Sequence, residues 1–336
     1  MILVTGATGL VGGHLLWHLL AQHDSVVAIR RASSSLVALR KLFAFYTDSP
    51  DVHLSRIQWR VADMCDEQSI ENAMHGIETI YHCAAVVSLG AGSNNLERTN
   101  VDGTVAILNA AIAHRVNRFC FVSSIAACGT ATDAQLIDEN TPIGNFAQRS
   151  EYARSKYESE MQVWKAIDKG LNAVIVNPGV ILGYSGSDRG SSELFARVRK
   201  GLPFYTSGGS GYVDVRDVVQ IMIRLVDLGV CNERFVLVAQ NCSNQEVLTW
   251  MAKGYKKPVP RIKIGSWILF AVGFISEMVS KISGTKTQID RSLARSATTR
   301  TFYSSDKIKL QLNYQFISID TCIGEVCAFE MNSEGI

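Results

Sequence analysis

The sequence predicts an α/β protein built on a doubly wound parallel sheet, followed by a smaller and mostly helical C-terminal domain. Two observations carry this prediction. Short β-rich runs alternate with longer helical patterns over residues 1–177, and a glycine-rich stretch joins the first run to the first helical pattern. Parallel neighbours need crossover connections, and the intervening helices supply them.

The predicted elements follow one another regularly up to Pro178. Strands are expected at 2–5, 26–30, 57–62, 79–83, 118–123 and 173–177, and helices at 10–22, 36–46, 69–74, 95–114 and 151–168. Beyond Pro178 glycine and serine become dense and the alternation changes. There we expect a helix at 193–200, a strand edge running into a helix over 213–226, one more strand at 235–239, and then mainly helix and loop with a last pattern around 304–314.

Composition indicates an ordered globular protein and excludes some partners. The 336 residues are 47% hydrophobic, and 33 basic residues face 31 acidic ones, a net charge of +2 without long runs of either sign. This balance excludes a nucleic-acid footprint. Eight scattered cysteines without a C-x-x-C pair predict free thiols in a reducing compartment, so we expect a cytoplasmic protein.

Neither apolar stretch predicts a membrane span. The first twenty residues lack the basic region of a signal peptide, and cleavage would remove the glycine-rich motif. The segment 267–275, WILFAVGFI, is far shorter than a spanning helix, so we expect a helix packed on the core or flanking an apolar pocket. His14 and His18 share a helical face without a third ligand pattern, which favours packing and predicts no metal site.

The glycine-rich motif TGATGLVG occupies residues 5–12, directly after a predicted strand and before a predicted helix. Glycine permits a tight turn and a close approach of the backbone to a pyrophosphate, whose charge the helix N-terminus stabilises. A structural turn is the alternative, but the position between the first strand and the first helix favours a dinucleotide. We expect a dinucleotide-binding domain of Rossmann type from 1–177 and about 212–240, and a substrate domain from about 178–211 and 241–336.

The end of the second strand indicates which dinucleotide binds. It reads VVAIRRAS with no carboxylate for a ribose 2′-hydroxyl, whereas arginine would hold a 2′-phosphate. The sequence therefore predicts NADP(H) over NAD(H), with Arg30 as the main contact and Arg31 or Ser33 assisting; the alternative is that these arginines are simply solvated. Asp63, after the third strand, is placed to bind an adenine amino group.

Catalytic chemistry is predicted at Tyr152 and Lys156, which lie at i and i+4 on one helical face. A tyrosine acts as acid or base near neutrality only if its pKa falls from about 10, a shift worth roughly 4 kcal/mol. A lysine ammonium about 4 Å away supplies roughly that amount at a dielectric of about 20. Tyr303 and Lys307 match the same spacing but lack a partner motif, so we interpret them as a chance match.

A serine after the fifth strand completes the predicted constellation. Its hydroxyl can hydrogen-bond a substrate carbonyl beside Tyr152, and we prefer Ser124 over its neighbour Ser123.

With these residues in hand, the chain resembles the extended short-chain dehydrogenase/reductase family, also called the NAD-dependent epimerase/dehydratase family. The resemblance covers roughly residues 1–240 and rests on TGATGLVG at 5–12, Asp63, HCAA at 82–85, NVDGT at 100–104, FVSS at 121–124, YARSK at 152–156, NPGVILG at 177–183 and YVDVRDV at 212–218. It implies a catalytic triad of Ser124, Tyr152 and Lys156, with the lysine also holding the nicotinamide ribose.

The cofactor contacts expected from these motifs form one set along the carboxyl ends of the predicted strands. They are Gly6, Thr8, Gly9, Leu10, Val11, Gly12, Arg30, Arg31, Asp63, Met64, Ala84, Ala85, Val122, Tyr152, Lys156, Asn177, Pro178, Gly179 and Val180. The resemblance also implies a homodimer formed through the helices at 95–114 and 151–168.

The branch of the family is indicated by three positions. Members that act on nucleotide sugars often carry arginines where this chain has Asn177 and Gly211, and the second motif here contains Arg216. This resembles the dihydroflavonol reductase, cinnamoyl-CoA reductase and hydroxysteroid dehydrogenase branch. We therefore expect an NADP(H)-dependent oxidoreductase for a carbonyl or secondary alcohol in a small, largely apolar substrate. A nucleotide-sugar epimerase or dehydratase is the alternative, and a cofactor-sensing protein without catalysis is a third.

Overall fold

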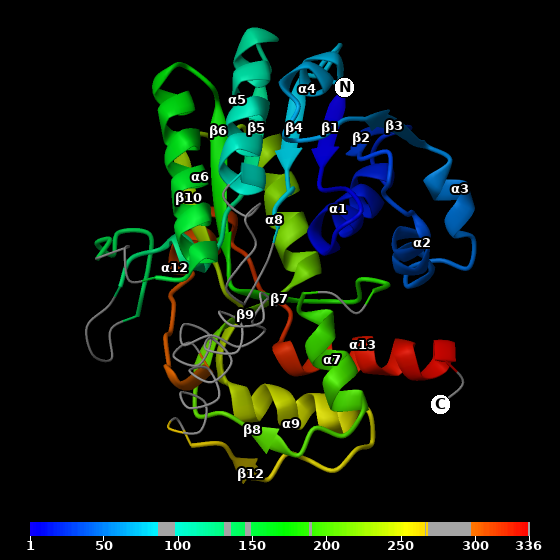
Figure 1. Cartoon of the computed structure of the whole chain (residues 1–336), viewed down its shortest axis with the longest axis vertical. Helices are drawn as coiled ribbons and strands as arrows, with labels where there is room; N and C mark the ends of the chain where they lie inside the picture. The colour runs from blue at the N-terminus through cyan, green and yellow to red at the C-terminus, as the bar shows by residue number, and fades with distance from the viewer. Residues whose placement is uncertain are drawn as a thin grey trace, which may run out of the picture.

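The computed structural model describes residues 1–86, 98–130, 136–144, 149–187, 190–265, 267 and 297–334. It is organised around one large sheet and a smaller part beneath the carboxyl ends of that sheet's strands (Figure 1).

The large sheet has seven strands in the order β10-β6-β5-β4-β1-β2-β3, and every neighbouring pair is parallel. This confirms the predicted doubly wound α/β class. The strands are β1 (Ile2–Thr5), β2 (Val26–Arg30), β3 (Ile57–Val61), β4 (Thr79–His82), β5 (Arg118–Val122), β6 (Ala173–Pro178) and β10 (Glu233–Leu237). The central strands are rich in Val, Ile and Phe because helices cover both of their faces.

Helices cover each face of this sheet and bury a separate apolar cluster. On one face lie α1 (Leu10–Leu20), α2 (Val37–Ala44), α8 (Val215–Asp227) and α12 (Asp306–Leu312). The other face carries α4 (Glu67–Asn72), α5 (Gly103–Ala113) and α6 (Glu151–Asp168). Helix α6 begins where expected because the Ser150 hydroxyl accepts from the Ala153 amide at 3.2 Å.

The smaller part is a mixed assembly of short strands and helices. One sheet pairs β9 (Gly209–Asp214) with β7 (Val180–Leu182) and β11 (Gln240–Ser243), and a second pairs β8 (Phe204–Tyr205) with β12 (Ile262–Lys263). Helices α7 (Ser192–Arg199), α9 (Asn244–Gly254) and α13 (Ile319–Glu334) pack around a third apolar cluster. A Ser243/Glu246 capping box starts α9.

Several features differ from the sequence prediction. A short helix α3 (Pro50–Leu54) begins at a proline, which suits a first helical turn, and it was not expected. A π-helical turn, η1 (Arg98–Asp102), precedes α5 within the expected helix 95–114, whose first three residues lie outside the described chain. The division into two domains stays a prediction. Among the described residues no helix combines the length and apolar character needed to cross a membrane.

Candidate active site

The glycine-rich motif forms a tight loop between β1 and α1. Gly6 has φ +65°, and a Cβ added there would lie 2.6 Å from the Ala84 amide nitrogen. A Cβ on Gly12 would lie 2.3 Å from the Gly6 carbonyl oxygen. Both positions therefore require glycine. Gly9 is the N-cap of α1 and no side chain caps that helix, so the loop keeps the open helix N-terminus that an anionic pyrophosphate needs.

A buried histidine that sequence reasoning did not single out fixes the strand ends beside this loop. The His82 ring, at the end of β4, is hydrogen-bonded through Nδ1 to the Thr5 hydroxyl at 2.7 Å and through Nε2 to the Thr104 hydroxyl at 3.1 Å. The Ala84 amide donates to the same Thr5 oxygen at 3.2 Å. Burial lowers the pKa of His82 to about 3, so the ring is neutral. The feature of the sequence that could have identified His82 is its position as the first residue of the HCAA motif.

Arg30 lies at the end of β2, and part of its guanidinium makes no hydrogen bond with the described residues. Its Nη1 donates to the Ser34 carbonyl at 3.4 Å and its Cζ lies 5.9 Å from the centre of the Trp59 ring. Its Nε is buried without a hydrogen-bond partner among the described residues. Arg31 is exposed nearby. Asp63 is also exposed, and its Oδ1 accepts from the Cys65 amide at 2.9 Å.

Ser124 and Tyr152 are brought together where β5 ends. Ser124 precedes the 3-10 turn η2 (Ile125–Ala127), and its Oγ accepts from the Ala126 amide at 3.1 Å. The Ser124 hydroxyl lies close enough to Tyr152 to oppose the rise in the pKa of Tyr152 that burial causes. Tyr152 comes from the first turn of α6, so the N-terminus of that helix delivers the phenol to the end of the strand.

Lys156 follows one turn later on α6 and is only 2% exposed. Its Nζ donates to the Val122 carbonyl at 2.7 Å and lies 4.8 Å from the centre of the Phe121 ring. Burial lowers its pKa to about 8, while Glu160 and Cys83 act in the opposite direction. The ammonium is therefore anchored on the last residue of β5.

The predicted lowering of the Tyr152 pKa is wrong for this arrangement. Burial raises the pKa of Tyr152, and among the described residues the Ser124 hydroxyl is the group that opposes that rise. The i, i+4 spacing places Lys156 on the correct helical face, but its long side chain turns to the Val122 carbonyl instead. The phenol is consequently held in its protonated form.

The two neighbouring serines have different partners. The Ser123 hydroxyl is buried and donates to Glu160 Oε2 at 2.6 Å. That hydroxyl is committed to the interior, whereas Ser124 faces Tyr152. This difference supports the preference for Ser124.

The second tyrosine–lysine pair does not share a helical face. Tyr303 pairs with Ile137 in an isolated β-bridge, outside any helix. Lys307 lies in the first turn of α12 and forms an ion pair with Glu233 at 2.7 Å. The interpretation of this pair as a chance match agrees with the structure.

Residues 177–180 continue the site along β6. Asn177 is fully buried, and its amide nitrogen donates to the Ser124 carbonyl at 3.1 Å and to Glu160 at 2.7 Å. Gly179 lies against β9, since a Cβ there would be 2.4 Å from the Gly211 carbonyl oxygen. Val180 is 37% exposed. The predicted helix 267–275 falls outside the described residues except for Trp267, which is exposed.

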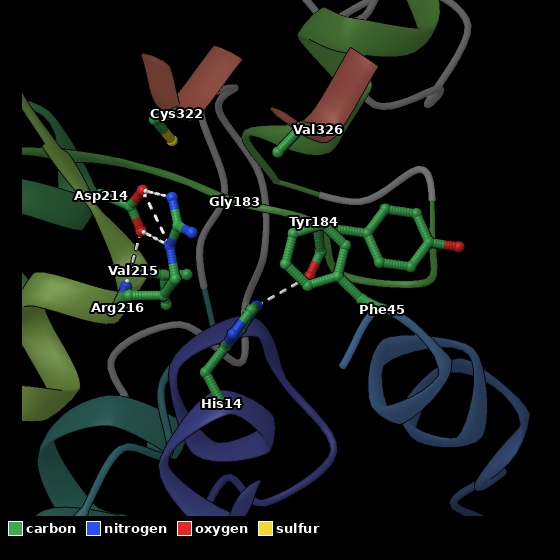
Figure 2. A pocket seen from close by; sticks show the side chains of 9 residues that line it. All are labelled: His14, Phe45, Gly183, Tyr184, Asp214, Val215, Arg216, Cys322 and Val326. Carbon is green, nitrogen blue, oxygen red and sulfur yellow. Dashed lines mark hydrogen bonds and ion pairs between the residues drawn. The ribbon is translucent and has the colours of Figure 1, made fainter. Parts of the chain in front are cut away.

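Arg216, in the second motif of the resemblance, is fully engaged in ion pairs. It binds Asp214 through Nε and Nη2 and lies 2.6 Å from Glu325. Figure 2 shows this pair beside a small cavity between α1, β7 and α13. The His14 ring borders the same cavity, with its two nitrogens on the Tyr46 hydroxyl at 2.5 Å and the Tyr184 carbonyl at 2.8 Å. No three-residue cluster suited to a metal occurs in the described part of the chain.

Comparison with known proteins agrees with this geometry. The model of the NAD dependent epimerase/dehydratase family matches residues 2–237. Sterol demethylase protein B of Methylococcus capsulatus is 30% identical over 284 residues, covering 83% of this chain and 82% of that protein. A protein of Synechocystis sp., named as a proposed dihydroflavonol 4-reductase, is 28% identical over 338 residues, covering 98% and 94%.

A solved structure shows the same fold. The Thermus thermophilus UDP-glucose 4-epimerase in complex with NAD matches with a TM-score of 0.72 and 19% identity, covering 97% of each chain. At that identity the likeness concerns the fold alone. The family match and the relatives support an oxidoreductase with a nicotinamide dinucleotide site. The chain therefore belongs to the NAD dependent epimerase/dehydratase family.

Proposed function

We propose that the protein is an NADP(H)-dependent oxidoreductase that moves a hydride between nicotinamide and a carbonyl or secondary alcohol of a small, largely apolar substrate. The observation that carries this proposal is the gathering of Ser124 and Tyr152 at the end of β5, with buried Lys156 anchored on the Val122 carbonyl beside them. Ligands of doubly wound sheets bind at this edge.

The residues present fit the cofactor. The glycine positions leave room that a Cβ would fill, and α1 presents an uncapped N-terminus for the pyrophosphate. When bound, nicotinamide supplies the hydride to a carbonyl carbon or accepts it from an alcohol carbon. The expected contacts named from the sequence, from Gly6 to Val180, remain the proposed binding set.

The chain's own groups handle the proton. Ser124 donates a hydrogen bond that orients the substrate oxygen, and Tyr152 gives that oxygen its proton as the alcohol forms. The raised pKa of Tyr152 keeps the phenol protonated, which suits the reducing direction. Lys156 keeps a positive charge at the end of β5 and is the proposed partner of the ribose hydroxyls.

The preference for NADP(H) rests on Arg30. Its Nε, which has no hydrogen-bond partner among the described residues, and the lack of a carboxylate at the end of β2 favour a 2′-phosphate over a free 2′-hydroxyl. Arg31, exposed at the next position, is the proposed second contact.

A nucleotide-sugar epimerase or dehydratase is the second candidate, favoured by the family match and by the likeness to a UDP-glucose 4-epimerase. Two observations argue for the reductase. Asn177, where nucleotide-sugar members often carry an arginine, is a neutral amide buried against Ser124 and Glu160, so it supplies no positive charge for a substrate diphosphate. Arg216 is neutralised by Asp214 and Glu325.

The assembly and location that we propose are a homodimer in the cytoplasm. The dimer rests on the resemblance, which implies contact through α5 and α6. All eight cysteines are free thiols, which suits a reducing compartment. Light scattering of the purified protein measures the mass, and a value of one chain contradicts the dimer.

The function is tested with a panel of aldehydes, ketones and steroids. The reductase reading predicts oxidation of added NADPH with at least one apolar carbonyl compound. Conversion of a UDP- or GDP-sugar without added NADPH, by protein that copurifies with its cofactor, would instead support the epimerase or dehydratase reading.

A further inference from the structure

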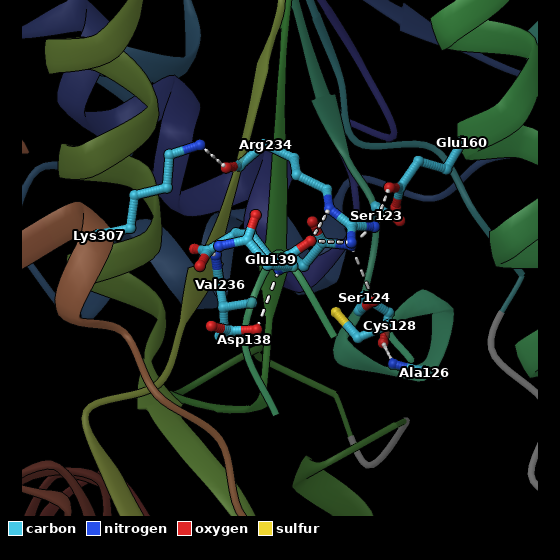
Figure 3. A network of polar contacts seen from close by, with 12 residues as sticks. Ser123, Ser124, Ala126, Cys128, Asp138, Glu139, Glu160, Arg234, Val236 and Lys307 are labelled. Atoms are coloured by element: carbon cyan, nitrogen blue, oxygen red, sulfur yellow. Dashed lines mark hydrogen bonds and ion pairs between the residues drawn. The ribbon is translucent and has the colours of Figure 1, made fainter. Parts of the chain in front are cut away.

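A buried carboxylate connects the helix that carries Tyr152 and Lys156 to three strands of the large sheet. Glu160 lies on α6, one turn beyond Lys156, and is only 2% exposed. Its Oε2 accepts from the Ser123 hydroxyl at 2.6 Å and from the Asn177 amide at 2.7 Å. Its Oε1 lies 3.2 Å from Arg234 Nη1 on β10. Figure 3 shows the side chains of Glu160 and Arg234 pointing toward each other.

Glu160 is also connected to Ser124, through the side chain of Asn177. The Asn177 amide nitrogen that donates to Glu160 also donates to the Ser124 carbonyl at 3.1 Å. Lys156, on the same helix as Glu160, holds the Val122 carbonyl at 2.7 Å. The three consecutive residues Val122, Ser123 and Ser124 are therefore each tied to α6, directly or through Asn177.

The far side of the carboxylate is also fixed. Arg234 donates through Nε to the Glu139 carbonyl at 3.1 Å, and the Glu139 carboxylate accepts from the Val236 amide at 2.7 Å. A buried charge needs such partners, and losing one of them leaves the others uncompensated. Arg234 therefore balances the charge of Glu160 on this side.

The negative charge of Glu160 also stabilises a second cation, the Lys156 ammonium. Lys156 is buried near titratable groups from two elements: Glu160 on its own helix, and His82 and Cys83 at the end of β4. Of these, Glu160 is the group engaged in an ion pair, with Arg234, whereas burial keeps Cys83 protonated and His82 neutral. Glu160 accordingly favours the charged form of Lys156 against the cost of burial.

We infer that Glu160 is a positioning residue of the active site: its carboxylate fixes the Ser124 backbone through Asn177 and supplies the negative charge that keeps the buried Lys156 ammonium in place. This inference rests on the proposed function, because it gives the network a role in the chemistry of Ser124, Tyr152 and Lys156. Glu160 itself touches neither substrate nor cofactor in this role.

Two substitutions at position 160 test the charge of the side chain and its length independently. Glu160→Gln keeps the length and removes the charge, and Glu160→Asp keeps the charge and shortens the reach. Glu158→Gln, on the same helix and only partly buried, is the matched control. We expect Glu160→Gln to lower kcat about tenfold and to move the alkaline fall of activity to lower pH by about one pH unit. Glu160→Asp lowers kcat several-fold while its alkaline fall stays where it is in the wild type.

A readout without turnover keeps this test separate from the proposed function. In protein labelled with ¹³C-lysine, the Lys156 signal, assigned by its loss in Lys156→Arg, reports its titration directly. The inference predicts that Lys156 loses its proton at lower pH in Glu160→Gln than in the wild type, in Glu160→Asp and in Glu158→Gln. An unchanged titration in folded Glu160→Gln, or a wild-type kcat in Glu160→Asp, overturns the inference. Absence of turnover in the wild type with every carbonyl substrate overturns the proposed function instead.

Discussion

The Lys156 ammonium donates to the Val122 carbonyl oxygen at 2.7 Å, so the helix and the strand that carry the proposed catalytic groups are joined at one buried contact. The contact places the positive charge at the end of β5, next to Ser124. Among the residues that the structure describes, burial raises the pKa of Tyr152 and no charged group lowers it.

This contact predicts a pH limit on activity. Burial lowers the pKa of Lys156 to about 8, so the ammonium is present below that pH and is lost as the pH rises through it. We expect kcat to fall above about pH 8 in the wild type. Lys156→Met should lower kcat about a hundredfold, since a buried donor at the reacting site is removed. Lys165→Met, on an exposed face of the same helix, is the control and should retain wild-type kcat.

The two serines should differ strongly when each is replaced by alanine. Ser124→Ala removes the hydroxyl beside Tyr152 and is expected to reduce kcat by about a hundredfold or more. Ser123→Ala removes only one of the partners of Glu160 and should reduce kcat by less than about tenfold. Steady-state kinetics on folded protein decide the matter. Equal losses in both variants contradict the assignment of Ser124.

Arg30→Ala tests the choice of cofactor. A guanidinium bound to a phosphate contributes about 1.5–3 kcal/mol, so the Kd for NADPH should rise about tenfold to a hundredfold. The Kd for NADH, which lacks the 2′-phosphate, should change little and serves as the internal control. Fluorescence titration measures both constants, and equal losses for the two cofactors remove the basis for the NADP(H) preference.

His14 predicts a stability that depends on pH. Burial lowers its pKa from 6.5 to about 4, so the unfolded state binds more protons between those values and stability falls as the pH drops. The contribution lost between pH 7.5 and pH 5 is about 2 kcal/mol. In His14→Gln, the free energy of unfolding should therefore fall between pH 7.5 and pH 5 by about 2 kcal/mol less than in the wild type. His23→Gln, at an exposed position, is the control, and urea denaturation at the two pH values measures all three proteins.

Part of the fold was predictable because its signals are local. The β-rich runs at β1, β2 and β5 and the helix α6 between Ser150 and Asp168 appear where the residues alone indicate, as does the glycine loop. The pairing of β7, β9 and β11 was not predicted, because strands of three to six residues are defined by partners distant in the sequence. The start of α3 at Pro50 was overlooked for a different reason, since a five-residue helix offers little periodicity.

In the site, too, features that depend on neighbouring residues were predictable, and contacts between residues distant in the sequence were not. The spacing of Tyr152 and Lys156 predicts a shared helical face but not the direction of a long side chain, which here turns to Val122. Glu160 sits in EYARSKYESE among other charges and reads as a solvated residue. Only its burial against Ser123, Asn177 and Arg234 reveals its role, and those residues come from three different strand regions.

The central claim is that Tyr152 supplies the proton in a hydride transfer to a carbonyl substrate. Its most direct test follows deuterium from NADPH in which both hydrogens at nicotinamide C4 are deuterium, with the product analysed by mass spectrometry. The claim predicts one deuterium on the new carbinol carbon with the wild type, and a rate reduced about a thousandfold with Tyr152→Phe. Unlabelled product, or a Tyr152→Phe variant that forms labelled product at the wild-type rate, would contradict it.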